Sequence, residues 1–140
     1  MNHQKVIMRC LDGRIVKGFI GHFSVLDEFV ALEDESSEMH RFGVDQLKAI
    51  FFVKTFEGKP EYSEKKTFRD PVSLGKRVFV KFKDGESMAG YIEGGVPWEK
   101  GFFLEPQKGP GFFLIPVDHD SNNIKVFVVA SSVWDVTVMG

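Results

Sequence analysis

The stretch Leu11-Asp12-Gly13-Arg14-Ile15-Val16-Lys17-Gly18-Phe19-Ile20 decides the fold, because a matching stretch begins 72 positions later (83 minus 11). That second copy reads Lys83-Asp84-Gly85-Glu86-Ser87-Met88-Ala89-Gly90-Tyr91-Ile92. In both copies an alternating apolar run precedes Asp-Gly, and Gly-aromatic-Ile stands five residues after the Gly of that pair. Asp-Gly between such runs signals a β-hairpin whose central residues have positive φ. Two hairpins in matching contexts indicate a duplicated β-module.

The strand before each turn has one inward face, and the second copy identifies it. Val78, Val80 and Phe82 alternate there with Phe79, Lys81 and Lys83. Successive side chains of a strand point to opposite faces, so the apolar set must face the core. The equivalent set in the first copy is Val6, Met8 and Cys10. Cys10 is therefore predicted to be a core residue, in preference to a reactive thiol.

Three further strands are predicted in the first module, over residues 29–32, 39–44 and 49–56, with one helical turn at 44–47. The acidic run at residues 33–38 reads as a solvated hairpin loop, in preference to a metal site. The apolar run at 50–53 predicts a strand that is covered on both faces. Five short strands with one helical turn before the last describe an SH3-like or Sm-like barrel.

The chain divides into a barrel at residues 1–57, a Lys-, Glu- and Ser-rich linker at 58–75, and a second barrel at 76–140. Aligning residues 133–136 with 47–50 moves the offset from 72 to 86, which implies 14 inserted residues in the second module (86 minus 72). The insertion falls around two near-identical hexads at 101–106 and 111–116. An extended, Phe-rich hairpin is expected there. The predicted fold class is all-β, with two tandem five-stranded barrels packed together through outward Phe and Tyr side chains.

Composition excludes several classes of function. A net charge of −2 and a pI near 6.1 argue against a general polyanion binder. The single cysteine, Cys10, excludes an intrachain disulfide and fits a reducing compartment. No apolar run approaches the roughly 18 residues of a membrane helix, and no leader pattern opens the chain. We therefore expect a cytoplasmic protein with no membrane partner.

The residues of both copies resemble a known superfamily. The pattern apolar-x-apolar-x-apolar-x-Asp-Gly-x-x-apolar-x-Gly-aromatic-apolar, at residues 6–20 and 78–92, is similar to the first signature motif of Sm-like domains. Residues 111–114 together with 121–128 also look like an uncharacterised bacterial family of such domains with no assigned activity. Sm-like RNA binders carry Asn or Asp after the second strand and Arg-Gly or Lys-Gly before the last. This chain has residues 24–28 and 94–100 at the first place, and 45–47 and 130–132 at the second. No RNA-site residue carries over.

Two sets of residues are candidates for binding. Outward aromatics are consistent with base stacking or with a domain or subunit contact, and we favour the contact. The candidate interaction surface consists of Phe19, Tyr91, Trp98, Phe103 and Phe112. A basic cluster in and after the linker could contact phosphates, although a solvated linker is favoured. The candidate nucleic-acid contacts are Lys65, Lys66, Arg69, Lys76 and Arg77.

Catalytic chemistry is not predicted. The four histidines lack ligand spacing, and Asp118-His119-Asp120 reads as a turn in preference to a metal triad. No phosphate loop, nucleophile elbow or cysteine pair is present. We expect no catalytic residue, cofactor or metal. The favoured hypothesis is a non-enzymatic interaction module that binds a protein partner or a copy of itself through strand edges and aromatics. The alternative is an Sm-like protein that binds RNA or other single-stranded nucleic acid.

Overall fold

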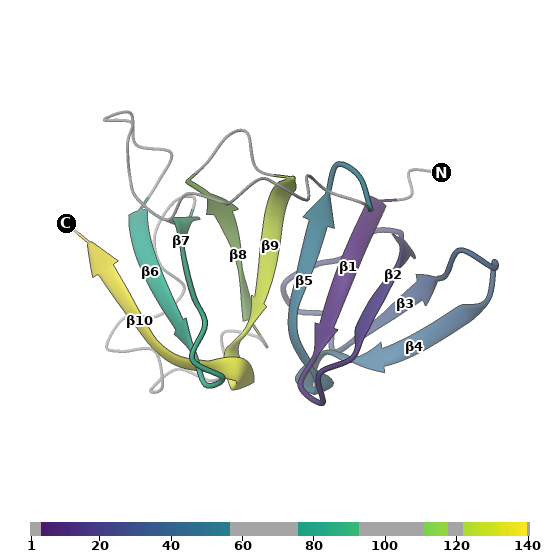
Figure 1. Cartoon of the computed structure of the whole chain (residues 1–140), viewed down its shortest axis with the longest axis horizontal. Helices are drawn as coiled ribbons and strands as arrows, with labels where there is room; N and C mark the ends of the chain where they lie inside the picture. Colours follow the sequence, from purple (N-terminus) through teal and green to yellow (C-terminus); the bar gives the residue numbers. More distant parts are fainter. Residues whose placement is uncertain (1–3, 57–75, 93–110, 118–121, 140) are drawn as a thin grey trace.

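The protein is all-β in the part of the chain that the structure describes. The computed structural model describes residues 4–56, 76–92, 111–117 and 122–139, and these form ten strands in one antiparallel sheet (Figure 1). The other regular elements within these ranges are two 3-10 turns, η1 (Val44–Gln46) and η4 (Ala130–Ser132). None of the described residues belongs to a helix of the length and apolarity that crossing a bilayer demands.

Each half of the chain supplies five strands. The first half forms β1 (Gln4–Cys10), β2 (Ile15–Ile20), β3 (Phe29–Glu33), β4 (Met39–Gly43) and β5 (Leu47–Val53). The second half forms β6 (Lys76–Phe82), β7 (Ser87–Ile92), β8 (Gly111–Pro116), β9 (Asn123–Val129) and β10 (Val133–Met139). A 3-10 turn precedes the last strand of each half.

The order of strands repeats within the sheet. From one edge to the other the order is β10-β6-β7-β8-β9-β5-β1-β2-β3-β4. Each half therefore reads fifth, first, second, third, fourth, which supports the duplication predicted from the two Asp-Gly stretches. Figure 1 shows the two halves as neighbouring curved units, with β9 beside β5.

The halves are joined differently from the prediction. Two tandem barrels docked through outward aromatics were expected, but β9 pairs directly with β5, so main-chain hydrogen bonds run through the junction and the sheet is continuous. Periodicity within a strand fixes its faces but not its distant neighbour, and the pairing between halves could not be read from it.

The two Asp-Gly turns have the same geometry. In the first, the Gly13 N–H donates to the Cys10 carbonyl at 3.1 Å and the Cys10 N–H to the Arg14 carbonyl at 2.9 Å. The second turn repeats both bonds around Gly85 at 3.0 and 2.8 Å. Only the glycines have positive φ, at 96° and 95°, so the expectation of two central residues with positive φ is corrected. The loop has three residues and ends in a left-handed glycine, which is the next commonest hairpin type.

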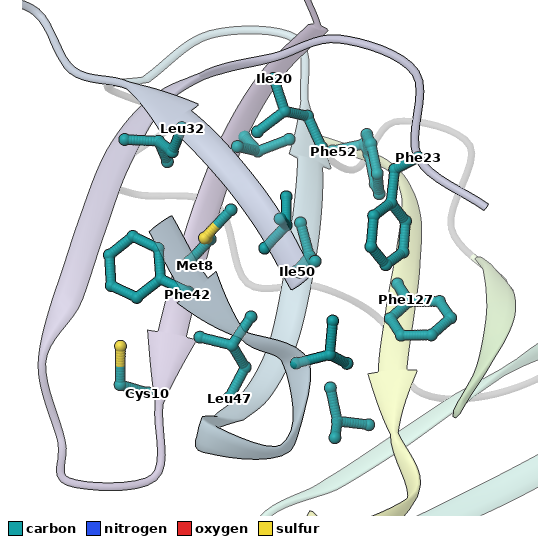
Figure 2. Close-up of a cluster of buried hydrophobic side chains, with 14 residues drawn as sticks. Met8, Cys10, Ile20, Phe23, Leu32, Phe42, Leu47, Ile50, Phe52 and Phe127 are labelled. Atoms are coloured by element: carbon teal, nitrogen blue, oxygen red, sulfur yellow. The ribbon is translucent and has the colours of Figure 1, made fainter. Parts of the chain in front are cut away.

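The predicted inward faces are confirmed. Val6, Met8 and Cys10 are at most 6% exposed, and their equivalents Val78, Val80 and Phe82 are at most 2% exposed. Burial raises the pKa of the Cys10 thiol, which keeps it protonated and makes it a poor nucleophile. Cys10 therefore acts as a core residue, and Figure 2 shows it beside Met8 and Phe42.

Some predictions fall on residues outside the described ranges. They include the linker at 58–75, the first hexad at 101–106 and the turn at 107–110. The second hexad forms β8, which pairs with β7 and β9. The insertion can still be divided. Leu114 lies next to Gly90 in the same way that Leu32 lies next to Gly18, so the third strands of the two halves are equivalent at an offset of 82. Ten of the inserted residues therefore precede the third strand (82 minus 72), and four follow it (86 minus 82).

Candidate interaction surface

The junction between the halves shows how this sheet accepts an added strand. In the register of β5 with β9, Ala49 lies opposite Val128 and Ile50 opposite Phe127. Ala49 packs into the core of the second half together with Val126 and Val128. β5 is therefore buried on both faces, as the apolar run at residues 50–53 predicted, and so are residues 126–129 of β9.

Phe127 completes the core of the first half although it belongs to the second. It is fully buried, and its ring centroid lies 4.8 Å from that of Phe23 and 5.1 Å from that of Phe113, both edge to face. Figure 2 shows Phe127 on β9 with its ring next to that of Phe23. Lys125 lies over the rings of Phe52 and Phe113, with its Nζ 4.8 Å from each centroid. Aromatic pairs of this geometry add about 0.5–1.5 kcal/mol to the effect of area burial.

A buried lysine connects the same two halves. The register of β5 with β1 shifts between Leu47 and Ala49, so Lys48 occupies a bulge. Its ammonium group lies 2.6 Å from the Asp84 carboxylate in the second hairpin turn and also contacts Glu86 and the Phe82 ring. Arg9 adds a 2.8 Å ion pair to Glu86. The first half thus supplies two cations and the second half two anions.

The stability of this junction should depend on pH. Hydrogen bonding to Lys48 chiefly lowers the pKa of Asp84, and hydrogen bonding to Arg9 chiefly lowers that of Glu86, from ordinary values of 3.8 and 4.5. A depressed folded-state pKa stabilises above the unfolded value, and that stabilisation is lost as the pH falls through the folded-state pKa. We expect urea unfolding at pH 7, 5 and 3 to show a stability loss below about pH 4.5 that shrinks in Lys48→Met. An equal loss in both proteins would contradict a role for Lys48.

The two outermost strands have one neighbour each within the described residues. β4 pairs with β3, and β10 pairs with β6, and they lie at opposite ends of the molecule (Figure 1). Large apolar side chains are exposed on them: Met39 at 62% on β4, and Trp134 at 63% and Val138 at 41% on β10. Edge strands with unpaired backbone groups and exposed apolar residues are templates for pairing with another chain.

The acidic loop predicted at residues 33–38 is the β3–β4 hairpin turn. The Asp34 carboxylate accepts hydrogen bonds from the Ser36 and Glu38 N–H groups, at 2.8 and 3.0 Å, and lies 2.7 Å from His40 Nε2. The bond to His40 is the main cause of the lowered pKa of Asp34. Carboxylate and imidazole atoms of Asp34, Glu38 and His40 lie within 4.8 Å of one another, which is close enough for a cation. The hydrogen bonds of Asp34 explain why these three side chains lie together, and they are those of a hairpin turn.

The candidate residues chosen from the sequence are placed as follows. Tyr91 and Phe112 are 3% and 4% exposed, so their side chains belong to the interior and form no part of an exposed surface. Phe19 is half-buried and packs edge to face on Phe56, 5.3 Å between centroids. Arg77 is half-buried on β6. The remaining candidates lie outside the described residues or have side chains outside them: Trp98, Phe103, Lys65, Lys66, Arg69 and Lys76.

Sequence reasoning missed the residues that form the junction and the edges. Lys48 and Trp134 stand at equivalent bulges in β5 and β10, and an alignment of residues 47–50 with 133–136 places them together. The sequence did hold a signal at this position. A lysine in one copy and a tryptophan in the other indicate that the two equivalent positions have different surroundings. Phe127 had a second signal, since residues 126–129 form a continuous apolar run like that of β5.

Comparison with known proteins gives a family and no activity. No curated protein matches the chain, and no solved structure matches it. Residues 2–140, nearly the whole chain, match one protein family. The chain belongs to the family of unknown function DUF6982.

Proposed function

We propose that the protein is a non-enzymatic interaction module that binds a protein partner, or a copy of itself, by adding a strand to an edge of its sheet. The observation that carries the proposal is the pair of outer strands β4 and β10, with Met39, Trp134 and Val138 exposed. Strand addition supplies affinity through main-chain hydrogen bonds and specificity through alternate side chains. Exposed Trp is the residue type most enriched among interface anchors.

The finer features of the proposal follow from the repeated half. Five strands with one 3-10 turn before the last occur twice, which supports an Sm-like unit in each half. We further propose a bacterial, cytoplasmic setting. The bacterial part rests on the resemblance of residues 111–114 and 121–128 to a bacterial family, and the cytoplasmic part on the single cysteine, which is free and buried and so suits a reducing compartment. The titratable side chains His40 and Lys48 are engaged in a hairpin turn and in the junction between the halves, which favours binding over catalysis.

Affinity capture with edge variants tests the proposal. Wild-type protein and a Met39→Lys/Trp134→Glu variant are immobilised, and bound proteins and self-association are compared. We expect the variant to lose what the wild type holds, because both substitutions place a charge where an apolar contact is needed. Leu26→Lys is the matched control, since Leu26 is 69% exposed but lies in the β2–β3 segment. A wild type that holds nothing would contradict the proposal, and salt-sensitive binding to single-stranded RNA would favour the alternative function.

A further inference from the structure

The internal junction and the outer edges are made of equivalent strands. The junction pairs the fourth strand of the second half, β9, with the fifth strand of the first half, β5. The outer strands are the fourth of the first half, β4, and the fifth of the second, β10. One end of the molecule therefore has a free fourth-strand edge and the other a free fifth-strand edge, and these are the two kinds of strand that pair at the internal junction. We propose that a second copy of this chain binds there, with its β4 paired to β10 in the register of β9 with β5. This inference rests on the proposed function and names its partner.

The register of the contact between copies follows from the 3-10 turns. η1 and η4 are equivalent at an offset of 86 (130 minus 44), so Gly43 corresponds to Val129 and Met39 to Lys125. In β10, Val138 corresponds to Phe52 at the same offset (138 minus 52). The internal pairing places Phe52 opposite Lys125. Transposed to the outer edges, Val138 of one copy lies opposite Met39 of the next.

Both members of this pair are exposed in the single chain, which favours their burial against each other. Met39 is 62% exposed and Val138 is 41% exposed. Directly opposite residues in an antiparallel pair have Cβ atoms about 4.5–5.5 Å apart, so the two side chains would touch. Phe29, 53% exposed on β3, lies on the same outer face as Met39 and widens the apolar surface. Val136, which packs against the second core, corresponds to Ile50 and would lie opposite Arg41, the residue in the place of Phe127.

The bulge residue gives an independent match. Lys48 in the bulge of β5 reaches the turn that holds Asp84 and Glu86. The equivalent bulge residue of β10 is Trp134, and the equivalent turn of the next copy is the β1–β2 turn. That turn is flanked by Leu11 and Ile15, exposed at 54% and 60%, where the second hairpin has Lys83 and Ser87. The lysine that meets two carboxylates inside the chain is thus replaced by an indole, which would face Asp12 and Arg14 at the equivalent positions, with Leu11 and Ile15 beside them.

Most of the exposed apolar surface in the described residues is accounted for by this one contact. Ten large apolar side chains are exposed there, and six would be covered: Leu11, Ile15, Phe29, Met39, Trp134 and Val138. Charge opposes the contact at a place where it stabilises the internal junction, because Lys81 and Arg14, which are both cations, take the places of Arg9 and Glu86. The contact between copies should therefore be weaker than the internal junction and should tolerate salt. A head-to-tail contact of this kind closes into a ring or extends into a filament.

Sedimentation velocity over a wide concentration range tests the inference. We expect wild-type mass to rise above that of one chain, and Trp134→Glu or Met39→Lys to weaken association by about tenfold or more, as for a central anchor. Leu26→Lys should associate as the wild type does. A chain that stays monomeric, or association that survives both substitutions, overturns the inference. Edge-dependent capture of a different protein would in either case leave the proposed function standing.

Disulfide trapping tests the register in a protein with its other surfaces intact. Met39→Cys and Val138→Cys are made in separate chains, each also carrying Cys10→Ala, and are oxidised alone and as a mixture. Because the contact is head to tail, only the mixture should form a linked pair in high yield, at a Cα separation that a disulfide spans. A linked pair of Met39→Cys chains alone would indicate a symmetric contact of β4 with β4, and a mixture that forms none would indicate another register. Either result overturns the inference.

Discussion

A Phe127→Ala variant is expected to lose about 3–5 kcal/mol of unfolding free energy, the cost of deleting a buried Phe ring. The loss should extend to the first half of the chain although residue 127 belongs to the second. Phe127 is fully buried among first-half side chains, with Phe23 4.8 Å away between ring centroids. Urea unfolding followed by circular dichroism measures the free energy. Amide hydrogen exchange in β1 and β2 measures whether the first half is affected.

The control for this experiment is Phe79→Ala. Phe79 is 36% exposed on β6 and belongs to neither buried cluster, so the same truncation should cost about 1 kcal/mol or less. A loss in Phe127→Ala that matches the control would show that β9 does not complete the first core. A large loss with unchanged exchange in β1 and β2 would show that the two halves unfold independently.

The local parts of the fold were predictable because their causes lie close together in the sequence. Alternation identified the buried faces of β1 and β6, and Asp-Gly located both hairpins. The left-handed glycines at 13 and 85 follow from the same dipeptide. The 3-10 turn at residues 44–46 was expected at 44–47. Each of these features depends on neighbours within a few residues, and the second copy removed the ambiguity of the first.

The junction was not predictable because it depends on a pairing between residues that are seventy or more positions apart. The apolar run at 50–53 indicated that both faces of β5 are covered, but it did not indicate that β9 pairs with β5. Comparison of the copies carries the missing information. Ala49 in β5 corresponds to Asp135 in β10, and Phe51 to Thr137. An apolar residue replaced by a polar one at the same position distinguishes a central strand from an outer one.

The candidate surface was predicted only in its general nature. Exposed aromatics and strand edges were expected, but Tyr91 and Phe112 proved to be buried, while Trp134 and Met39 are exposed. The error has a physical cause. Alternation predicts an outward side chain only where one face of the sheet is solvated, but consecutive residues 89–92 of β7 are all buried, and Phe112 of β8 faces the second core.

The second large effect is expected at Gly18, where Gly18→Ala should cost about 3 kcal/mol, the upper end of the usual range for overpacking. A Cβ on residue 18 would lie 2.5 Å from the Glu33 carbonyl oxygen and 2.6 Å from Leu32 Cδ2. The carbonyl belongs to β3, which pairs with β2 at Phe19 and Glu33, so the backbone itself must move. Thermal and urea unfolding measure the loss.

Gly21→Ala is the matched control, because a Cβ on residue 21 meets no atom within 4 Å and the same substitution should be nearly neutral there. Gly90 repeats the close approach in the second half, 2.6 Å from the Ile115 carbonyl oxygen, so Gly90→Ala should behave like Gly18→Ala. Equal losses at positions 18 and 90 would mean that the bend of the second strand over the third is a requirement of the repeated unit itself. A variant at position 18 as stable as the one at 21 would mean that the second strand can move away from the third, and the glycine would then need another explanation.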